Sequence, residues 1–251
     1  MTKVTKAALT ERARQYGCAS LLGTRNAKTV KGNDRGYLTG VLYMMPDDQL
    51  CPMSREAGCR EACLVTAGRA AFQPGIGEAR AGRTKFFHQD RWAFTRLLEL
   101  EIRALKHKAE KQGLTLAIRL NGTSDIDWSS IELDFGETIF ERFPDVIFYD
   151  YTKRPDIMRK SAGVSNWHIT GSYSEASAKY KAMIWAAAEK YGCNLSVVFD
   201  SPDFPASFHG RRVIDGDAND LRFEDPASVI VGLKAKGDAK QDTTGFVIAA
   251  A

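Results

Sequence analysis

Hydrophobic residues fall into short runs separated by polar clusters, and the spacing within each run predicts an element. Residues 36–45 form an apolar run rich in strand formers that stops at Pro46, which is typical of a buried strand. Residues 91–111 repeat apolar side chains at helical spacing and predict a helix. Residues 175–191 show the same spacing, with Gly192 placed as a C-cap, and predict a second helix.

Further runs of β-branched and aromatic residues predict strands at 114–120, 146–151, 167–170, 195–199, 212–214 and 229–233. Near-continuous apolar strands that alternate with helices indicate a parallel sheet covered on both faces. We therefore expect an α/β fold, a partial or distorted (β/α) barrel of mostly parallel strands. It would form a single domain over residues 36–251 behind a basic leader at residues 1–35.

Polar side chains follow the predicted strands where the strands end, and such folds place their chemistry there. We expect these groups to converge on one site. The candidate catalytic residues among them are Asp125, Asp127, Asp150, Lys153 and Asp215.

Asp125 and Asp127 flank Ile126, so in an extended segment they point the same way. Two close carboxyl groups can raise each other's pKa, as acid–base pairs do. The alternative is that one of them is a loop aspartate that caps the next helix.

Composition and charge narrow the class of protein. The hydrophobic fraction of 44% and the charged fraction of 26% are those of a soluble globular chain. No apolar run approaches the roughly 18 residues of a membrane span, and the N-terminus lacks the apolar core of a secretory signal. We therefore expect a cytoplasmic protein without membrane contact.

The net charge is only +4, but the basic excess is concentrated in residues 1–35, which carry eight Lys and Arg against two acidic residues. This leader is expected either to contact nucleic-acid phosphates or to be a solvated segment without a partner.

Three of the five cysteines lie within thirteen residues, in a C-x7-C-x3-C pattern formed by Cys51, Cys59 and Cys63. Three thiolates in one loop can hold a tetrahedral zinc or an iron–sulfur cluster. If the chain is helical from Arg60 onward, Cys59 and Cys63 lie on one face. Zinc would need a fourth ligand, for which His88 is the first candidate and Cys18 the second. Alternatively, the three cysteines are reduced and packed as small hydrophobic residues.

A cysteine loop straight after the first strand, followed by a helix and alternating strands and helices, resembles the radical S-adenosylmethionine superfamily. The resemblance implies a [4Fe–4S] cluster on the three cysteines and S-adenosylmethionine as a cofactor. The usual spacing there is C-x3-C-x2-C, from which this chain departs. The cofactor-binding residues would be Arg119, Asn121, Thr123, Ser124 and Ser172.

The wider pattern resembles a phage-encoded family of unassigned function, from about residue 25 onward. It is carried by Cys51-Pro52, residues 62–64 and 66–69, 119–126, 148–153, 213–217, 220–223 and 231–237. This resemblance implies a viral origin and a host cytoplasmic location, with no defined activity.

Three functions remain open. The first is an iron–sulfur enzyme that acts on a small molecule, a nucleotide or nucleic acid. The second is a zinc-stabilised, transglycosylase-like enzyme that modifies bases with the aspartates at the strand ends. The third is a non-enzymatic DNA- or protein-binding protein that a metal stabilises.

Overall fold

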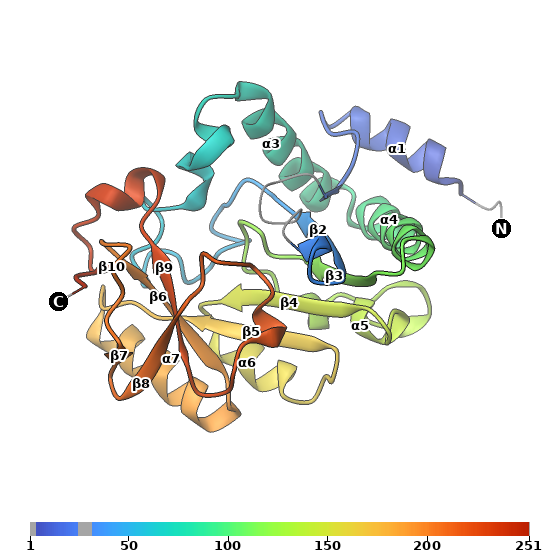
Figure 1. The fold of residues 1–251 in the computed structure, drawn as a ribbon. Coiled ribbons are helices and arrows are strands. Elements are labelled where there is room, and N and C mark those ends of the chain that lie inside the picture. The colour runs from blue at the N-terminus through green and yellow to red at the C-terminus, as the bar shows by residue number, and fades with distance from the viewer. Residues whose placement is uncertain (1–3, 25–31, 251) are drawn as a thin grey trace. The chain divides into compact units, whose positions relative to one another are not determined.

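The computed structural model describes residues 4–24 and 32–250, and Figure 1 shows the arrangement of its helices and strands. Lys3, Arg25, Lys28 and Lys31 of the basic leader lie outside the described residues. The chain divides into two compact units. The first comprises residues 1–46 and 73–148, and the second comprises residues 47–72 and 149–251.

The helices of the first unit are α1 (Lys6–Arg14), α3 (Pro74–Gln89), α4 (Arg91–Lys111) and α5 (Ile139–Arg142). Its strands are β1 (Leu22–Gly23), β2 (Tyr37–Leu42), β3 (Thr115–Arg119) and the first part of β4 (Ile147–Thr152). Strands β2, β3 and β4 are parallel, and β1 pairs with β2 in the antiparallel direction.

The core of the first unit lies between α4 and the strands. Phe94, Leu97 and Ile102 are fully buried on one face of α4, which contacts both β2 and β3. The rings of Phe86 and Phe87 on α3 lie 5.4 and 5.2 Å from that of Phe94, edge to face. This spacing is the one that aromatic pairs prefer, so it fixes α3 against α4.

The second unit contains α6 (Pro155–Ser161) and α7 (Ala178–Tyr191). Its strands are the rest of β4, β5 (Trp167–Ser172), β6 (Asn194–Phe199), β7 (Ser207–Phe208), β8 (Arg211–Asp215), β9 (Ile230–Lys234) and β10 (Val247–Ile248). Strands β5, β6, β9 and β8 are parallel neighbours in that order, and β7 and β8 form an antiparallel hairpin. The C-terminal strand β10 adds to the carboxyl end of β6.

Single-turn 3-10 helices connect these elements. They are η1 (Leu64–Thr66), η2 (Gly68–Ala71), η3 (Trp128–Ser130), η4 (Asp134–Gly136), η5 (Arg222–Glu224) and η6 (Gly237–Gln241).

The predicted α/β class with a mostly parallel sheet is confirmed, whereas closure into a barrel is not seen. Within residues 4–24 and 32–250, the ten strands follow the order β1-β2-β3-β4-β5-β6-β9-β8-β7, with β10 on β6, and this order does not return to its first strand. Barrel character therefore stays a prediction. Among the described residues, no helix is long and apolar enough to cross a membrane.

Several predicted elements have different ends in the structure, for local reasons. The first predicted strand, 36–45, stops at Leu42, because the chain leaves the sheet and Met44 pairs with Thr123 instead. The helix predicted from residue 175 begins at Ala178, because the Ser177 side chain accepts a hydrogen bond from the Tyr180 amide and forms the N-cap.

Part of the predicted leader is folded. Helix α1 packs on α4, and Arg12 of α1 forms an ion pair with Asp90, the residue before α4. The backbone amides of Leu21 and Leu22 donate to the buried carboxylate of Glu101 on α4. Residues 4–23 thus contribute to the first unit.

Candidate functional site

The segment after β3 is a loop of polar residues that is buried along its whole length. Residues 120–128 are all buried, although they include two aspartates, an asparagine, a threonine and a serine. Buried polar groups are costly unless they are hydrogen-bonded, so this loop must satisfy most of its own groups.

Asn121 and Ser124 hold this loop closed. The side-chain amide of Asn121 donates to the Ile126 carbonyl oxygen at 2.9 Å, and its oxygen accepts from the Ile126 amide at 3.0 Å. The Ser124 hydroxyl donates to the same Asn121 oxygen at 2.8 Å. These two predicted cofactor-binding residues therefore have a structural role in the loop.

Thr123 joins the loop to the segment after β2. Its hydroxyl donates to the Met44 carbonyl oxygen (2.5 Å) and accepts from the Met44 amide (3.1 Å). Asp127 is the N-cap of η3 and accepts from the Ser129 amide (3.1 Å) and from the hydroxyls of Ser129 and Ser130. Of the two readings of Asp127, the helix cap is the one that these contacts support.

Two further predicted residues border the same loop. Arg119 is the last residue of β3 and is buried, as is Asp125. The structure thus brings together Arg119, Asn121, Thr123, Ser124, Asp125 and Asp127 at the carboxyl end of β3 in the first unit.

The other predicted strand-end residues belong to the second unit. Asp150 lies within β4 and is almost completely buried, and Ser172 is the last residue of β5. Lys153 follows β4, with its ammonium group 6.0 Å from the centre of the Phe246 ring. Asp215 ends β8, where it is exposed and accepts from the Asp217 amide at 2.8 Å.

The cysteine segment consists of turns, so the helix considered from Arg60 onward is not formed. Residues 52–62 are turns, and the 3-10 helix η1 begins only after Cys63. Cys59 and Cys63 are therefore not on one face of a helix. This corrects the argument from sequence that placed their two sulfurs together.

Hydrogen bonds from the rest of the second unit hold the cysteine segment. The buried Ser174 hydroxyl donates to the Ala57 carbonyl oxygen at 2.8 Å, and the Thr244 hydroxyl donates to the Gly58 carbonyl oxygen at 3.1 Å. The Asp238 amide donates to the Thr66 hydroxyl at 3.2 Å. Cys59 packs against a buried cluster formed by Ala62, Ala235, Ala239 and Phe246.

The structure shows no assembled ligand set for the zinc or iron–sulfur centre expected from the sequence, within the residues that it describes. In the part of the chain that the structure describes, no three His, Cys, Asp or Glu side chains are grouped as metal ligands. His88 is exposed on α3. The cluster, the zinc and S-adenosylmethionine stay predictions.

A different group of titratable side chains meets at the carboxyl end of β5. The Tyr173 hydroxyl donates to Glu175 Oε1 at 3.0 Å and lies 3.2 Å from His209 Nε2. Lys181 on α7 donates to the same Glu175 oxygen at 2.6 Å. We call Glu175, Tyr173 and His209 the β5-end triad.

The electrostatics of the β5-end triad separate the roles of its members. The hydrogen bond from Lys181 lowers the pKa of Glu175, so this carboxyl group is ionised near neutral pH. Burial, together with the hydrogen bond to Glu175, raises the pKa of Tyr173 well above its ordinary value. The phenol therefore stays protonated.

His209 occupies a tight turn with positive φ. Phe208 pairs with Arg211, so His209 and Gly210 form a two-residue hairpin loop in which both residues have positive φ, +47° and +80°. Such loops favour Asn-Gly, because most other residues adopt positive φ at a cost. The His209 side chain is 46% exposed, and its ring lies 4.3 Å from the Phe208 ring and 5.3 Å from the Trp185 ring.

The β5-end triad was missed from the sequence, although part of the signal was present. Ser172, the last residue of β5, was a predicted site residue, but Tyr173, Glu175 and His209 were not among the candidates. The His209-Gly210 pair, which can form the two-residue turn of a hairpin, was the available signal for His209.

Comparison with models of protein families finds a match over most of the chain. The model of the family described as Gene product 88 matches residues 20–250 of the chain. The chain belongs to the gene product 88 family. This confirms the resemblance to a phage-encoded family of unassigned function. Comparison with curated proteins and with solved structures found no match. Membership in the gene product 88 family carries no residue roles, so the roles rest on geometry.

Proposed function

We propose that the chain is an enzyme that transfers a proton at His209, with Tyr173 and Glu175 as positioning residues. The observation that carries this proposal is the unbroken series of contacts from Lys181 through Glu175 and Tyr173 to His209. A proton-transferring imidazole that a second group orients, itself oriented by a third, is the arrangement of general acid–base sites.

The direction of the hydrogen bonds follows from the charges. Glu175 is an acceptor only, because it is ionised, and Tyr173 has a single hydroxyl proton to donate. When Tyr173 donates to Glu175, its oxygen is left to accept a hydrogen bond from Nε2–H of His209. The second ring nitrogen, Nδ1, is then the one that takes a proton from the substrate or returns it.

The position of the triad supports a catalytic role. Tyr173 and Glu175 directly follow β5, and open α/β sheets bind their ligands at the carboxyl ends of parallel strands.

The surroundings of His209 favour a substrate with a flat ring, such as a nucleobase. Phe208 and Trp185 offer aromatic rings next to the imidazole. Aromatic rings stack on bases. The Arg211 guanidinium, 5.0 Å from the centre of the Trp185 ring, is paired with Glu189 within the chain. A nucleotide or single-stranded nucleic-acid substrate also agrees with the expectation from the sequence.

The test is turnover of a defined panel by the purified full-length chain. The panel contains nucleoside mono-, di- and triphosphates and short single-stranded DNA, and products are identified by chromatography and mass spectrometry. We expect the wild type to convert at least one member, and His209→Asn to be slower by about 100-fold or more. Tyr173→Phe keeps the ring but loses the hydroxyl, and should also be slower.

The matched control is His107→Asn, which removes an exposed histidine from α4 in the first unit. Its rate should equal that of the wild type. Failure of the wild type to convert any member of the panel, or an unchanged rate in His209→Asn, would overturn the proposal.

A further inference from the structure

Residues 242–246 form a bend that lies against the backbone of Glu175 in the β5-end triad. The Glu175 amide donates to the Gly245 carbonyl oxygen at 2.8 Å. Gly245 has a φ of +92°, and a Cβ added to it would lie 3.0 Å from the Glu175 carbonyl carbon and 3.1 Å from the Ala176 nitrogen. The two backbones are in direct contact, so the place of Glu175 depends on the 242–246 bend.

The half-buried side chain of Asp242 holds this bend in shape. Its Oδ2 atom accepts hydrogen bonds from the Gly245 amide at 3.2 Å and from the Val247 amide at 3.0 Å. Burial disfavours the charged form of Asp242, but these donors outweigh burial and lower its pKa. Hydrogen bonds to an ionised carboxylate are stronger than those to a neutral acceptor. Asp242 thus fixes the amide of Gly245, whose carbonyl oxygen holds Glu175.

The bend is also anchored to the rest of the second unit. Phe246 is buried in the cluster that contacts Cys59. Directly after the bend, Val247 pairs with Val198 where β10 adds to β6. These contacts fix the bend relative to the sheet, so the hydrogen bonds of Asp242 carry the position of the sheet to Glu175.

Tyr173 and Glu175 are held by different elements. The Tyr173 amide donates to the Ser196 carbonyl oxygen of β6 at 2.9 Å, a hydrogen bond that does not involve the bend. The hydrogen bond of 3.0 Å from the Tyr173 hydroxyl to Glu175 Oε1 therefore depends on both anchors. A change that loosens the bend should move Glu175 and leave Tyr173 in place.

We infer that Asp242 is a positioning residue for the β5-end triad, because it shapes the bend that keeps the Glu175 carboxylate within hydrogen-bond distance of Tyr173. The consequence for catalysis rests on the proposed function of His209, whereas the position of Glu175 does not. Misplacement of a supporting group by about 1 Å can slow a reaction by about 100-fold.

Alkaline titration of Tyr173, followed by ultraviolet absorbance of the full-length chain, tests this inference without any substrate. Burial raises the pKa of Tyr173, and the Glu175 carboxylate raises it further. Asp242→Ala should lower this pKa by about half as much as Glu175→Gln does, or more, because the carboxylate moves away from the phenol. Asp242→Asn keeps one acceptor oxygen and should fall between Asp242→Ala and the wild type. Tyr173→Phe assigns the signal, and circular dichroism at neutral pH shows which variants are folded.

Asp200→Ala is the matched control. Asp200 is exposed and accepts from the Ala250 amide at 2.9 Å, so this variant loosens the chain after β10 but not the bend. Its titration should equal that of the wild type. An unchanged titration in the folded Asp242 variants, or an equal change in Asp200→Ala, would overturn the inference. An unchanged titration in Glu175→Gln would also overturn it, since no coupling would remain for Asp242 to hold.

Activity separates this inference from the proposed function. On a substrate that the wild type converts, Asp242→Ala should lower kcat and leave KM nearly unchanged, because Asp242 does not contact the substrate. A wild type that converts no member of the panel would overturn the proposed function alone, and the titration would still decide the role of Asp242.

Discussion

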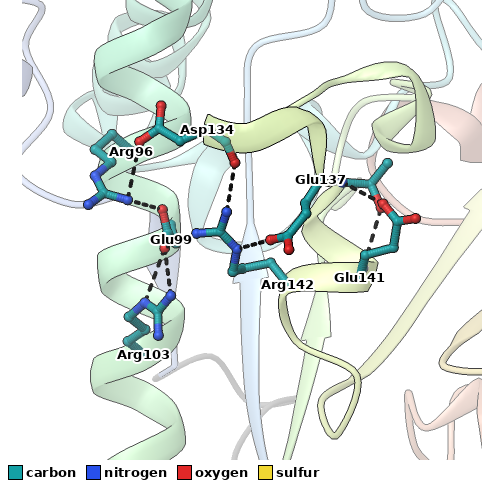
Figure 2. A network of polar contacts seen from close by, with 8 residues as sticks. Arg96, Glu99, Arg103, Asp134, Glu137, Glu141 and Arg142 are labelled. Atoms are coloured by element: carbon teal, nitrogen blue, oxygen red, sulfur yellow. Dashed lines mark hydrogen bonds and ion pairs between the residues drawn. The ribbon is translucent and has the colours of Figure 1, made fainter.

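At the scale of single residues, the charged groups inside this chain are explained by the partners that hold them. The Glu101 carboxylate accepts hydrogen bonds from the backbone amides of Leu21 and Leu22. The Glu99 carboxylate accepts hydrogen bonds from the side chains of Arg96 and Arg103 (Figure 2). Both glutamates are buried, yet each has a different pKa. Burial raises the pKa of Glu101, whereas at Glu99 the arginines outweigh burial and lower it.

Protonation of Glu99 should lower the free energy of unfolding in acid. Because its pKa is lowered in the folded state, its contribution is present above the ordinary pKa of glutamate and is lost as the pH falls through the folded value. We expect Glu99→Gln to cost about 1.5–3 kcal/mol at neutral pH, and to cost less as the solution is acidified. The free energies of unfolding of the wild type and Glu99→Gln, measured from neutral to acidic pH, check the prediction.

The control for this experiment is Glu110→Gln, which changes an exposed carboxylate on the same helix. It should change stability by less than about 0.5 kcal/mol at all pH values. Equal effects of the two variants would show that the arginines around Glu99 do not stabilise the fold.

Tyr173 should report directly on Glu175. The negative charge of Glu175 helps to keep the phenol protonated, so Glu175→Gln should lower the pKa of Tyr173 toward its ordinary value of 10.0. Ultraviolet absorbance during an alkaline titration measures this, with Tyr173→Phe to assign the signal. Glu189→Gln removes a carboxylate that pairs with Arg211 instead and should leave the titration unchanged. An unchanged titration in Glu175→Gln would contradict the coupling.

At the scale of elements, the cysteine segment depends on close packing around Gly58. This glycine has φ of +67°, and an added Cβ would lie 2.5 Å from Thr244 Oγ1 and 2.6 Å from Ala176 Cβ. Any side chain larger than that of glycine would displace these neighbouring residues. The segment is thus fitted to residues that lie more than a hundred positions later in the chain.

Gly58→Ala should therefore destabilise far more than a comparable change elsewhere. We expect a loss of about 2–4 kcal/mol from strain and overpacking together. Gly68→Ala is the comparison, because Gly68 also has positive φ (+63°) but has no atom within 4 Å of an added Cβ. That variant should lose only about 1 kcal/mol. Similar losses in chemical denaturation would refute the packing at Gly58.

The elements with strong periodicity could be predicted from the sequence. Helix α4 was predicted with the ends that the structure has, and the runs that became β3, β4, β6 and β9 were placed within one residue at each end. Helix α3 was not predicted, because its buried face includes Arg80 and Gly82 and gives no apolar stripe. The two-residue strands β1, β7 and β10 are too short for a pattern and depend on their pairing partners.

At the scale of the whole molecule, the sequence could predict only the kind of place where a site would lie, the ends of strands, and not the residues that form it. The rule that polar groups at strand ends carry chemistry pointed to the carboxyl end of β5 among other strand ends, but it could not rank the residues there. His209 lies thirty-four positions beyond Glu175, and only the hairpin of β7 and β8 brings it to Tyr173. Asn121, Thr123 and Ser124 form hydrogen bonds that hold a loop, which the sequence did not predict, and their predicted role in cofactor binding stays a prediction.

The whole chain should keep its stability when metals are removed. The cysteine segment is held by Ser174, Thr244 and Thr66 through hydrogen bonds that need no metal. We therefore expect chelators to leave the thermal midpoint unchanged, and Cys63→Ser to unfold as the wild type does. Anaerobic purification, metal analysis and calorimetry check this. Release of zinc or iron with a drop of several degrees would instead support the ligand set expected from the sequence.

The central claim is that the His209 imidazole transfers a proton, and chemical rescue tests it most directly. His209→Gly suits the positive φ of the turn and leaves space for free imidazole. On the nucleotide that the wild type converts, this variant should be inactive and should regain activity as imidazole is added. Tyr173→Phe, which retains His209, should not respond. Full activity of His209→Gly without imidazole, or no recovery with it, would contradict the account.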